Sequence, residues 1–381
     1  MVKMKQVNIG IIGGGLMGRE AAGAFGRWFT LNDFPAGVAL TAVCDLNQQV
    51  LDWYKGVPTV RLMTTDYKEL LADPEIDVVY VALPHNLHKE FYLEVLAAGK
   101  DLLGEKPFGM NLEDALAIQD AGEAYGRFVR CSSEMPFLPG PQRVIKEVLS
   151  GRLGQIIEIR AGFLHSSDLD PMKPINWKRQ TKFCGEIGVM GDLGMHVLHV
   201  PLRLGWRPQT VYAQLQGIFT QRPDGKGGVA ACDTWNNAIL NTTVEIAGEK
   251  VPMMLETKRI APGETNTWYI EVLGTKGGVK YSTKETKTLW TFRLDGDEQQ
   301  WQRTDLGFKG VPFPTITGGI FEPGFSDCFM QMLAAYVAER AGELNGRFGC
   351  VTPREAVESH YVFAAALKSF AGQTVEKVTY Q

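Results

Sequence analysis

Short apolar runs alternate with amphipathic stretches through the first third of the chain. Continuous β-branched runs predict strands, and apolar positions three and four residues apart predict helices. The first expected strand begins at Val7 and runs into a glycine turn, and the later strands are expected at Val38–Asp45, Asp77–Leu83, Asp101–Gly104 and Phe128–Ser132. Helices are expected between them, at Leu16–Phe25, Tyr67–Leu71, His88–Ala98 and Leu112–Tyr125. Because strands separated by helices pair in parallel, residues 1–132 are expected to form an α/β domain.

The pattern changes at about Gly151, where strand-like runs follow one another with turns and few helices between them. These runs are expected to pair mainly antiparallel, and they lie at Ile156–Phe163, Thr210–Ile218, Thr234–Ile246, Val251–Ile260, Trp268–Val272, Gly278–Ser282 and Thr288–Leu294. Two helical runs, Asp327–Ala341 and Pro353–Phe370, follow, and Arg222–Gly228 is expected to be a loop. Residues 133–381 are therefore expected to form an α+β domain with a large, open, mostly antiparallel sheet.

Composition narrows the class of protein. A chain of 381 residues is long enough for about two domains. Its 45% hydrophobic and 22% charged residues are typical of a globular protein in water. The net charge of −4 argues against a nucleic-acid-binding or membrane-binding surface, and no apolar run approaches the ~18 residues of a membrane span. Six cysteines without a C-x-x-C pair predict reduced thiols in a cytoplasmic protein without a metal site.

The glycine turn after the first strand carries the first candidate chemistry. Gly13, Gly15 and Gly18 fit G-x-G-x-x-G, with Leu16 and Met17 between the last two. In this arrangement the glycines permit a tight turn, the approach of backbone to a pyrophosphate and close packing of the following helix. A strand before the match and a helix after it favour a dinucleotide site. The alternative is an ordinary strand-to-helix turn without a ligand.

Asp45 ends the second expected strand. An acid at this place accepts hydrogen bonds from the ribose hydroxyls of the cofactor, and its charge repels a 2′-phosphate. No basic residue follows it directly, so the sequence favours NAD over NADP. The segment Phe29–Gly37 explains why Asp45 lies further from the turn than usual. The alternative is an aspartate that only caps the next helix.

Three further motifs follow the glycine turn along the chain and also carry candidate chemistry. Gly104-Glu105-Lys106-Pro107 ends a parallel strand, and Gly191-Asp192-Leu193-Gly194-Met195-His196 begins a helix of the second domain. The third is Leu83-Pro84-His85-Asn86-Leu87-His88. In this order the motifs resemble the glucose–fructose oxidoreductase / inositol dehydrogenase family (Gfo/Idh/MocA) over nearly the whole chain.

The resemblance implies an N-terminal Rossmann domain and an active site between this domain and the face of the large sheet. Carried over, Lys106 contacts the hydroxyl that is oxidised, His196 takes its proton, and Asp192 holds substrate and tunes the histidine. The chemistry agrees, because histidine has a suitable pKa for a general base and a lysine ammonium stabilises a developing alkoxide. Pro107 is implied to follow a cis bond. The alternatives are a solvated lysine, an N-capping aspartate and a core histidine. His199 is the second candidate for the base, although its apolar neighbours favour a core role.

The resemblance also assigns residues to the ligands. The cofactor contacts it implies are Gly13, Gly15, Leu16, Met17, Gly18, Asp45, Leu83, Pro84, His85, Asn86, His88, Glu105 and Lys106. Helix capping or packing is an equal alternative for His88. Where the family often has an arginine or tyrosine followed by a polar residue, this chain has Glu134-Met135-Pro136-Phe137-Leu138, which puts in doubt the transfer of substrate contacts from that strand.

The long segment His165–Glu186 is expected to meet the substrate. Trp177 offers a flat apolar face for a sugar, and Lys173, Lys178, Arg179 and Lys182 make the segment locally cationic. The full set of expected substrate contacts is Lys106, Trp177, Lys178, Arg179, Asp192, His196 and His199. The alternative is a solvated loop or a subunit contact.

The expected function is that of a cytoplasmic NAD-dependent dehydrogenase of a pyranose sugar derivative or inositol, acidic ones included. An alternative is an NAD-retaining glycosidase that acts by transient oxidation, elimination and re-reduction. A regulator without chemistry is a third class, against which the intact Lys106, Asp192 and His196 argue. Since an open sheet leaves one face uncovered, a homodimer or homotetramer is expected, with no nucleic-acid or membrane partner.

Overall fold

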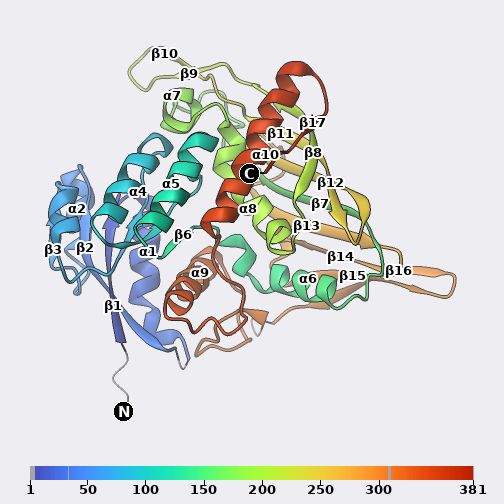
Figure 1. Cartoon of the computed structure of the whole chain (residues 1–381), viewed down its shortest axis with the longest axis horizontal. Helices are drawn as coiled ribbons and strands as arrows, with labels where there is room; N and C mark the ends of the chain where they lie inside the picture. The colour runs from blue at the N-terminus through green and yellow to red at the C-terminus, as the bar shows by residue number, and fades with distance from the viewer. Residues whose placement is uncertain (1–4, 33, 308–309, 381) are drawn as a thin grey trace.

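The computed structural model describes residues 5–32, 34–307 and 310–380. Two sheets lie at opposite ends of an elongated molecule, and helices pack between them and on the outside of the first sheet (Figure 1). Helix α9 (Phe325–Arg340) packs against α1 (Leu16–Gly26), and α10 (Pro353–Gly372) packs against both α5 (Leu112–Ala124) and the second sheet. The last two helices of the chain therefore tie the second half to the first.

The first sheet is parallel. Within the described residues it contains six strands in the order β3-β2-β1-β4-β5-β6. Their bounds are Lys5–Ile12 (β1), Ala36–Cys44 (β2), Leu62–Thr64 (β3), Val78–Val81 (β4), Asp101–Gly104 (β5) and Val129–Cys131 (β6). The helices that connect them besides α1 and α5 are α2 (Gln48–Tyr54), α3 (Tyr67–Ala72) and α4 (His88–Ala97). Because all neighbouring pairs are parallel, the segments that follow β1, β4, β5 and β6 meet at one edge.

The second sheet is mixed. In the described part of the second domain it has nine strands in the order β16-β15-β14-β13-β7-β12-β11-β8-β17. The bounds are Ile156–His165 (β7), Pro208–Gln216 (β8), Asn237–Ile246 (β11), Glu249–Lys258 (β12), Asn266–Gly274 (β13), Gly277–Ser282 (β14), Thr288–Asp295 (β15), Glu298–Asp305 (β16) and Glu376–Lys377 (β17). Strands β7 and β12 pair in parallel, and the remaining pairs are antiparallel. The expectation of a mostly antiparallel sheet is confirmed.

One face of this sheet is covered by helices. Helices α6 (Pro139–Leu149), α8 (Gly188–Arg203) and α10 pack on it. The alternation of β12 shows the reason, because Val251, Met253 and Leu255 are buried and the residues between them are more exposed. Burial of a side chain of this size contributes ~1.5–3 kcal/mol.

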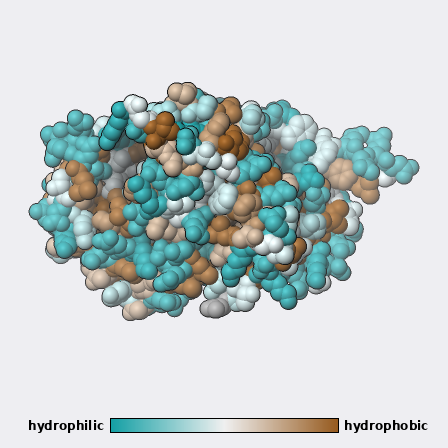
Figure 2. Space-filling view, turned by 90° about the horizontal axis from the view of Figure 1, so that it is seen from above, coloured by the Kyte–Doolittle hydropathy of each residue, from teal (hydrophilic) through white to brown (hydrophobic). Residues whose placement is uncertain are grey.

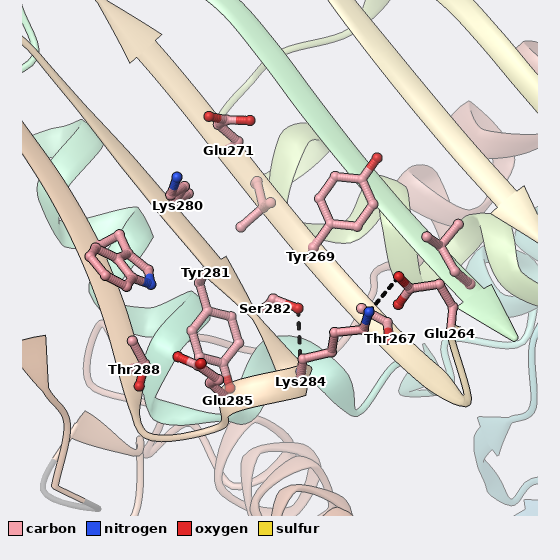
Figure 3. A pocket seen from close by; sticks show the side chains of 13 residues that line it. Glu264, Thr267, Tyr269, Glu271, Lys280, Tyr281, Ser282, Lys284, Glu285 and Thr288 are labelled. Atoms are coloured by element: carbon pink, nitrogen blue, oxygen red, sulfur yellow. Dashed lines mark hydrogen bonds and ion pairs between the residues drawn. The ribbon is translucent and has the colours of Figure 1, made fainter. Parts of the chain in front are cut away.

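The opposite face carries no helix in Figure 1 over the strands that the structure describes. Figure 3 shows a hollow on it, where Tyr269 of β13 and Lys280 of β14 stand on neighbouring strands. The hollow has a volume of about 380 Å³. The hairpin of β15 and β16 continues past it as a narrow projection from the end of the molecule (Figures 1 and 2).

Some elements differ from the expectation. The sequence pattern missed α2, β3, α6 and β16. The expected loop Arg222–Gly228 belongs to a small hairpin, in which Arg222 and Pro223 end β9 (Gln221–Pro223) and the rest forms the turn to β10 (Val229–Ala231). Helix α6 begins with Pro139-Gly140-Pro141, which looks like a break, although proline fits the first turn of a helix. Strand β16 is largely exposed and lacks an apolar alternation, so only its pairing with β15 identifies it.

Candidate active site

The glycine turn between β1 and α1 fits a dinucleotide pyrophosphate. Gly13 has φ +96°, and a Cβ there would lie 2.3 Å from the carbonyl oxygen of Ala82. Gly15 caps α1 without a side-chain hydrogen bond, and a Cβ at Gly15 would meet nothing within 4 Å. Gly15 thus leaves open space beside the backbone at the positive end of α1. A Cβ at Gly18 would lie 2.5 Å from the carbonyl oxygen of Gly13, which explains the third glycine.

Asp45 lies beside this turn, directly after β2. Its Oδ2 accepts a hydrogen bond of 2.9 Å from the Gly14 N–H, and its Oδ1 accepts one of 2.8 Å from the Asn47 N–H. These bonds hold the carboxylate at the edge where the strands end. A carboxylate has about four lone-pair sites, so two remain for ribose hydroxyls. The residues of the turn and Asp45 therefore fit an adenosine dinucleotide.

A cleft of about 700 Å³ lies between the two domains, and most of the predicted site residues line it. The predicted residues in its wall are Gly15, Leu16, Met17, Leu83, Pro84, His85, Glu105, Lys106, Trp177, Lys178, Arg179, Asp192 and His196. Its size is that of a ligand pocket. The cleft joins the carboxyl edge of the parallel sheet to helix α8.

Asp192 is the centre of the charged groups in this cleft. Its Oδ1 accepts hydrogen bonds from Lys106 at 3.1 Å and from Lys178 at 2.8 Å, and its Oδ2 accepts from both Nε and one Nη of Arg259 at 3.2 and 3.1 Å. Burial opposes ionisation of this carboxyl, but Lys178, Lys106 and Arg259 outweigh it and hold its pKa well below the usual range. Asp192 is therefore ionised throughout the neutral range.

Lys106 follows β5, and its ammonium also donates to the carbonyl oxygen of Asp192 at 2.8 Å. Burial works against its charge, yet Asp192, with Glu105 and Glu134, raises the pKa of Lys106. The Lys106–Pro107 bond is cis, as the resemblance implies. A Cβ at Gly191 of α8 would meet Pro107 at an ordinary van der Waals distance of 3.5 Å, but it would lie 2.7 Å from the Ile187 side chain.

His196 lies one helical turn after Asp192, on the same side of α8, and it is 2% exposed. The ring of Phe163 meets it edge-on, with centroids 5.3 Å apart, and Trp268 Nε1 donates to its carbonyl oxygen at 2.9 Å. Burial, and then the charge of Lys106, hold the pKa of His196 well below its ordinary value. The imidazole is therefore neutral near pH 7 and able to accept a proton.

The segment expected to meet the substrate forms a wall of the cleft. The Trp177 ring stands edge-on to His85, with centroids 4.8 Å apart, and so reaches the N-terminal domain. Arg179 pairs with the buried carboxylate of Asp168, and Lys173 lies 3.4 Å from the same group. Lys178 pairs with Asp192, so these cations are directed inward and held by carboxylates of the protein.

Some predicted residues do not line the cleft. His199 is packed against Phe348, with ring centroids 4.7 Å apart, and burial lowers its pKa to about 3. Its expected substrate contact is corrected to a core position. His88 lies within hydrogen-bond distance of two carbonyl oxygens, that of Pro107 at 2.7 Å and that of Leu83 at 2.8 Å. It thus supports two segments of the wall from behind, which replaces the expected contact with the cofactor.

Gly13, Gly18, Asp45 and Asn86 also lie outside the cleft wall. Gly13 and Gly18 belong to the adjoining glycine turn described above, and Asp45 lies beside that turn.

Sequence reasoning missed several members of the cleft. Every second residue from Val251 to Thr257 is buried, and Arg259 is the next residue in this alternation. A charged residue at a position expected to be buried could therefore have been recognised from the sequence as a candidate site residue. Glu134 follows β6 at the same sheet edge as Lys106. His165, at the end of β7, also lines the cleft, and burial lowers its pKa to about 4. No sequence motif marks it as a site residue.

In residues 5–32, 34–307 and 310–380, no helix is both long and apolar enough to cross a membrane. Among the same residues, no three His, Cys, Asp or Glu side chains are grouped so that they could hold a metal ion.

Comparison with known proteins places the chain in a family. Residues 7–132 match the model of the oxidoreductase family with an NAD-binding Rossmann fold, and residues 142–280 match the GFO/IDH/MocA C-terminal domain. Levoglucosan dehydrogenase of Pseudarthrobacter phenanthrenivorans is 26% identical over 313 residues, 79% of this chain and 80% of that protein. Glucose-6-phosphate 3-dehydrogenase of Bacillus subtilis is 26% identical over 281 residues, 72% of this chain and 74% of that protein.

The fold agrees with solved structures. A levoglucosan dehydrogenase in complex with NADH and levoglucosan superposes with a TM-score of 0.87 at 22% identity, over 99% of this chain and 100% of that chain. Because both family models match in chain order and the whole fold is shared, the protein belongs to the GFO/IDH/MocA family of NAD-dependent oxidoreductases.

Proposed function

We propose that the protein is a dehydrogenase that transfers hydride between NAD and a hydroxyl-bearing carbon of a pyranose sugar derivative or inositol. The observation that carries this proposal is the convergence of Lys106, Asp192 and His196 in the interdomain cleft. The names of the relatives support the substrate class, since levoglucosan and glucose 6-phosphate are sugars. When NAD is bound, its nicotinamide supplies the acceptor for the hydride.

The charges of the cleft distribute the proton chemistry among the three residues. Asp192 is held ionised by three cations, so it is a poor acceptor of a proton near neutral pH. His196 is neutral there and takes the hydroxyl proton. Lys106 remains a cation beside the same oxygen and stabilises the alkoxide that develops. Asp192 orients the lysine by accepting its hydrogen bond.

Trp177 and Lys178 are the proposed determinants of the substrate. The indole presents an apolar face suited to a sugar ring, and its contact with His85 holds it across the cleft. Lys178 adds a second ammonium beside Lys106 and therefore suits an acidic substituent. Arg179 is the weaker candidate for that role, because Asp168 already engages its guanidinium. We therefore place Arg179 in the wall and Lys178 in contact with the substrate.

We also propose that a second copy of the chain covers the open face of the large sheet. Tyr269, which Figure 3 shows beside the hollow, and Trp290 line it from this face, and aromatic residues of this kind are enriched in subunit interfaces.

The cofactor preference is expected to depend on Asp45. Replacement by Asn keeps a side-chain oxygen for the Gly14 or Asn47 N–H but removes the charge that repels a 2′-phosphate. Asp45→Asn and Asp45→Ala should both raise NADP affinity relative to NAD. Titration of both cofactors, with the exposed Asp52→Asn as control, measures the ratio. Tighter binding of NADP than of NAD by the unaltered protein would refute the preference.

The reaction itself is tested by counting hydride. Purified protein is incubated with NAD and a panel of inositols, neutral pyranoses, uronic acids and sugar glycosides, while reduced nicotinamide and sugar products are quantified. We expect one reduced nicotinamide for each oxidised sugar. Release of aglycone with the bulk cofactor still oxidised would instead establish the NAD-retaining glycosidase. Equal turnover of neutral and acidic sugars would remove the role given to Lys178.

A further inference from the structure

Glu134 is a buried carboxylate that the proposed chemistry leaves without a role. It follows β6 at the carboxyl edge of the parallel sheet, is 5% exposed and lines the interdomain cleft. Its Oε2 lies 3.8 Å from Nδ1 of His196. This is longer than the ~2.7–3.2 Å of a hydrogen bond, and such contacts often tighten when substrate binds.

The two ring nitrogens of His196 have different surroundings. Nδ1 is buried and has no hydrogen-bond partner among the described residues. The nearest acid to it is Glu134. Since the two nitrogens of an imidazole point in different directions, Nε2 is the nitrogen left to meet a hydroxyl in the cleft. A buried nitrogen without a partner costs stability, so the position calls for a group that bonds to it during the reaction.

We propose that Glu134 is a positioning residue that holds the proton of His196 on Nδ1 and thereby leaves Nε2 free to act as the base; this rests on the proposed dehydrogenation. Ionised Glu134 accepts a hydrogen bond from Nδ1–H. In the oxidation, the hydroxyl proton moves to Nε2 as the hydride leaves the same carbon for the cofactor. The imidazolium that forms is stabilised by the carboxylate behind it. In the reverse direction Nε2 returns the proton to the alkoxide oxygen.

The protonation of Glu134 controls which tautomer forms. A neutral Glu134 instead donates a hydrogen bond to Nδ1 and keeps its proton, so the single ring proton of the neutral imidazole lies on Nε2 and blocks the base. Burial, followed by the charge of Glu105, raises the pKa of Glu134 to about 7. The other titratable groups around the pair are Lys106, Asp192, His165, His199, Tyr80, Cys131 and Cys328. Hydride transfer should therefore fall as the pH drops through about 7, as Glu134 gains a proton.

Kinetics provide the first test. In Glu134→Gln the acid limb near pH 7 should disappear, and kcat should drop at least ~10-fold with little change in KM, since an orienting carboxylate acts on the base and not on binding. Glu134→Asp keeps the charge and should restore the acid limb with part of the rate. The matched control is Glu358→Gln, a buried glutamate of α10 that is paired with Arg207 and lies outside the cleft wall. An unchanged pH profile in Glu134→Gln would overturn the proposal.

A second test needs no substrate. The chain has six histidines, so the signals of ¹⁵N-labelled imidazole nitrogens can be resolved by NMR. The signal that is absent from the spectrum of His196→Gln is that of His196. Above pH 8, the unaltered protein should show His196 with the proton on Nδ1, and Glu134→Gln should lose this preference. The same tautomer in both proteins would refute the proposal. If no sugar of the panel reduces NAD, the proposed function fails, while the NMR comparison still decides the role of Glu134.

Discussion

Replacement of Lys106 by Met is expected to lower the rate of hydride transfer by ~10²-fold or more while NAD affinity changes little. The ammonium is a buried donor held on Asp192, and in the proposed reaction it stabilises the oxygen that becomes negative, whereas methionine fills the space without the charge. His196→Ala should cost a similar factor, because it removes the general base. In the proposed cofactor site the glycine turn and Asp45 supply most of the binding, and neither change touches them.

Single-turnover absorbance of reduced nicotinamide measures the transfer, and a binding titration with NAD measures the affinity. Lys182→Met is the control for Lys106, because Lys182 belongs to the same cationic segment but is exposed and lies outside the cleft wall. A variant of Lys106 or His196 that transfers hydride at the rate of the unaltered protein would reject the role given to that residue.

Asp192→Asn is expected to destabilise the protein and to abolish most of its activity. The substitution leaves Lys106, Lys178 and Arg259 in a buried cluster without the carboxylate that all three contact. Removal of one partner from a buried ion pair costs ~3–5 kcal/mol. The loss should also lower the pKa of Lys106, since Asp192 contributes most of the attraction that raises it.

The pH dependence of this effect has a definite sign. The folded-state pKa of Asp192 lies below the ordinary value of 3.8, so its stabilising contribution is present above about pH 4 and is lost as the pH falls through the folded-state pKa. The difference in unfolding free energy between the two proteins should therefore be full at pH 7 and shrink below pH 4. Denaturant unfolding at several pH values measures it, with the exposed Asp120→Asn as control. A difference below ~1 kcal/mol at pH 7 would contradict the charge cluster.

The sequence predicts those elements well whose structure is decided by neighbouring residues in the chain. The glycine turn, the alternating strands and helices, and the bounds of α4, β5 and α5 follow from apolar periodicity and breakers. It fails where partners far away in sequence decide the structure. Strand β16 is polar and forms only because β15 offers an edge, and β3 is three residues long.

The candidate site divides in the same way. Lys106, Asp192 and His196 were predictable because each belongs to a motif in its expected order. Arg259 and Glu134 reach the same cleft from the ends of β12 and β6, and their distances to Asp192 and His196 depend on how these strands pack against helix α8, which lies far from them in the sequence. His199 could not be separated from His196 by spacing, because one helical turn placed it against Phe348 and away from the cleft.

The most direct measurement follows the hydrogen itself. A sugar that the panel identifies is prepared with deuterium on the carbon that carries the reacting hydroxyl and is incubated with the protein and NAD. We predict that the deuterium appears in the reduced nicotinamide, one for each ketone formed, and that Lys106→Met and His196→Ala slow its appearance without changing its destination. Deuterium that stays in the sugar, or exchanges with water while the cofactor remains oxidised, would contradict a net NAD-dependent dehydrogenation.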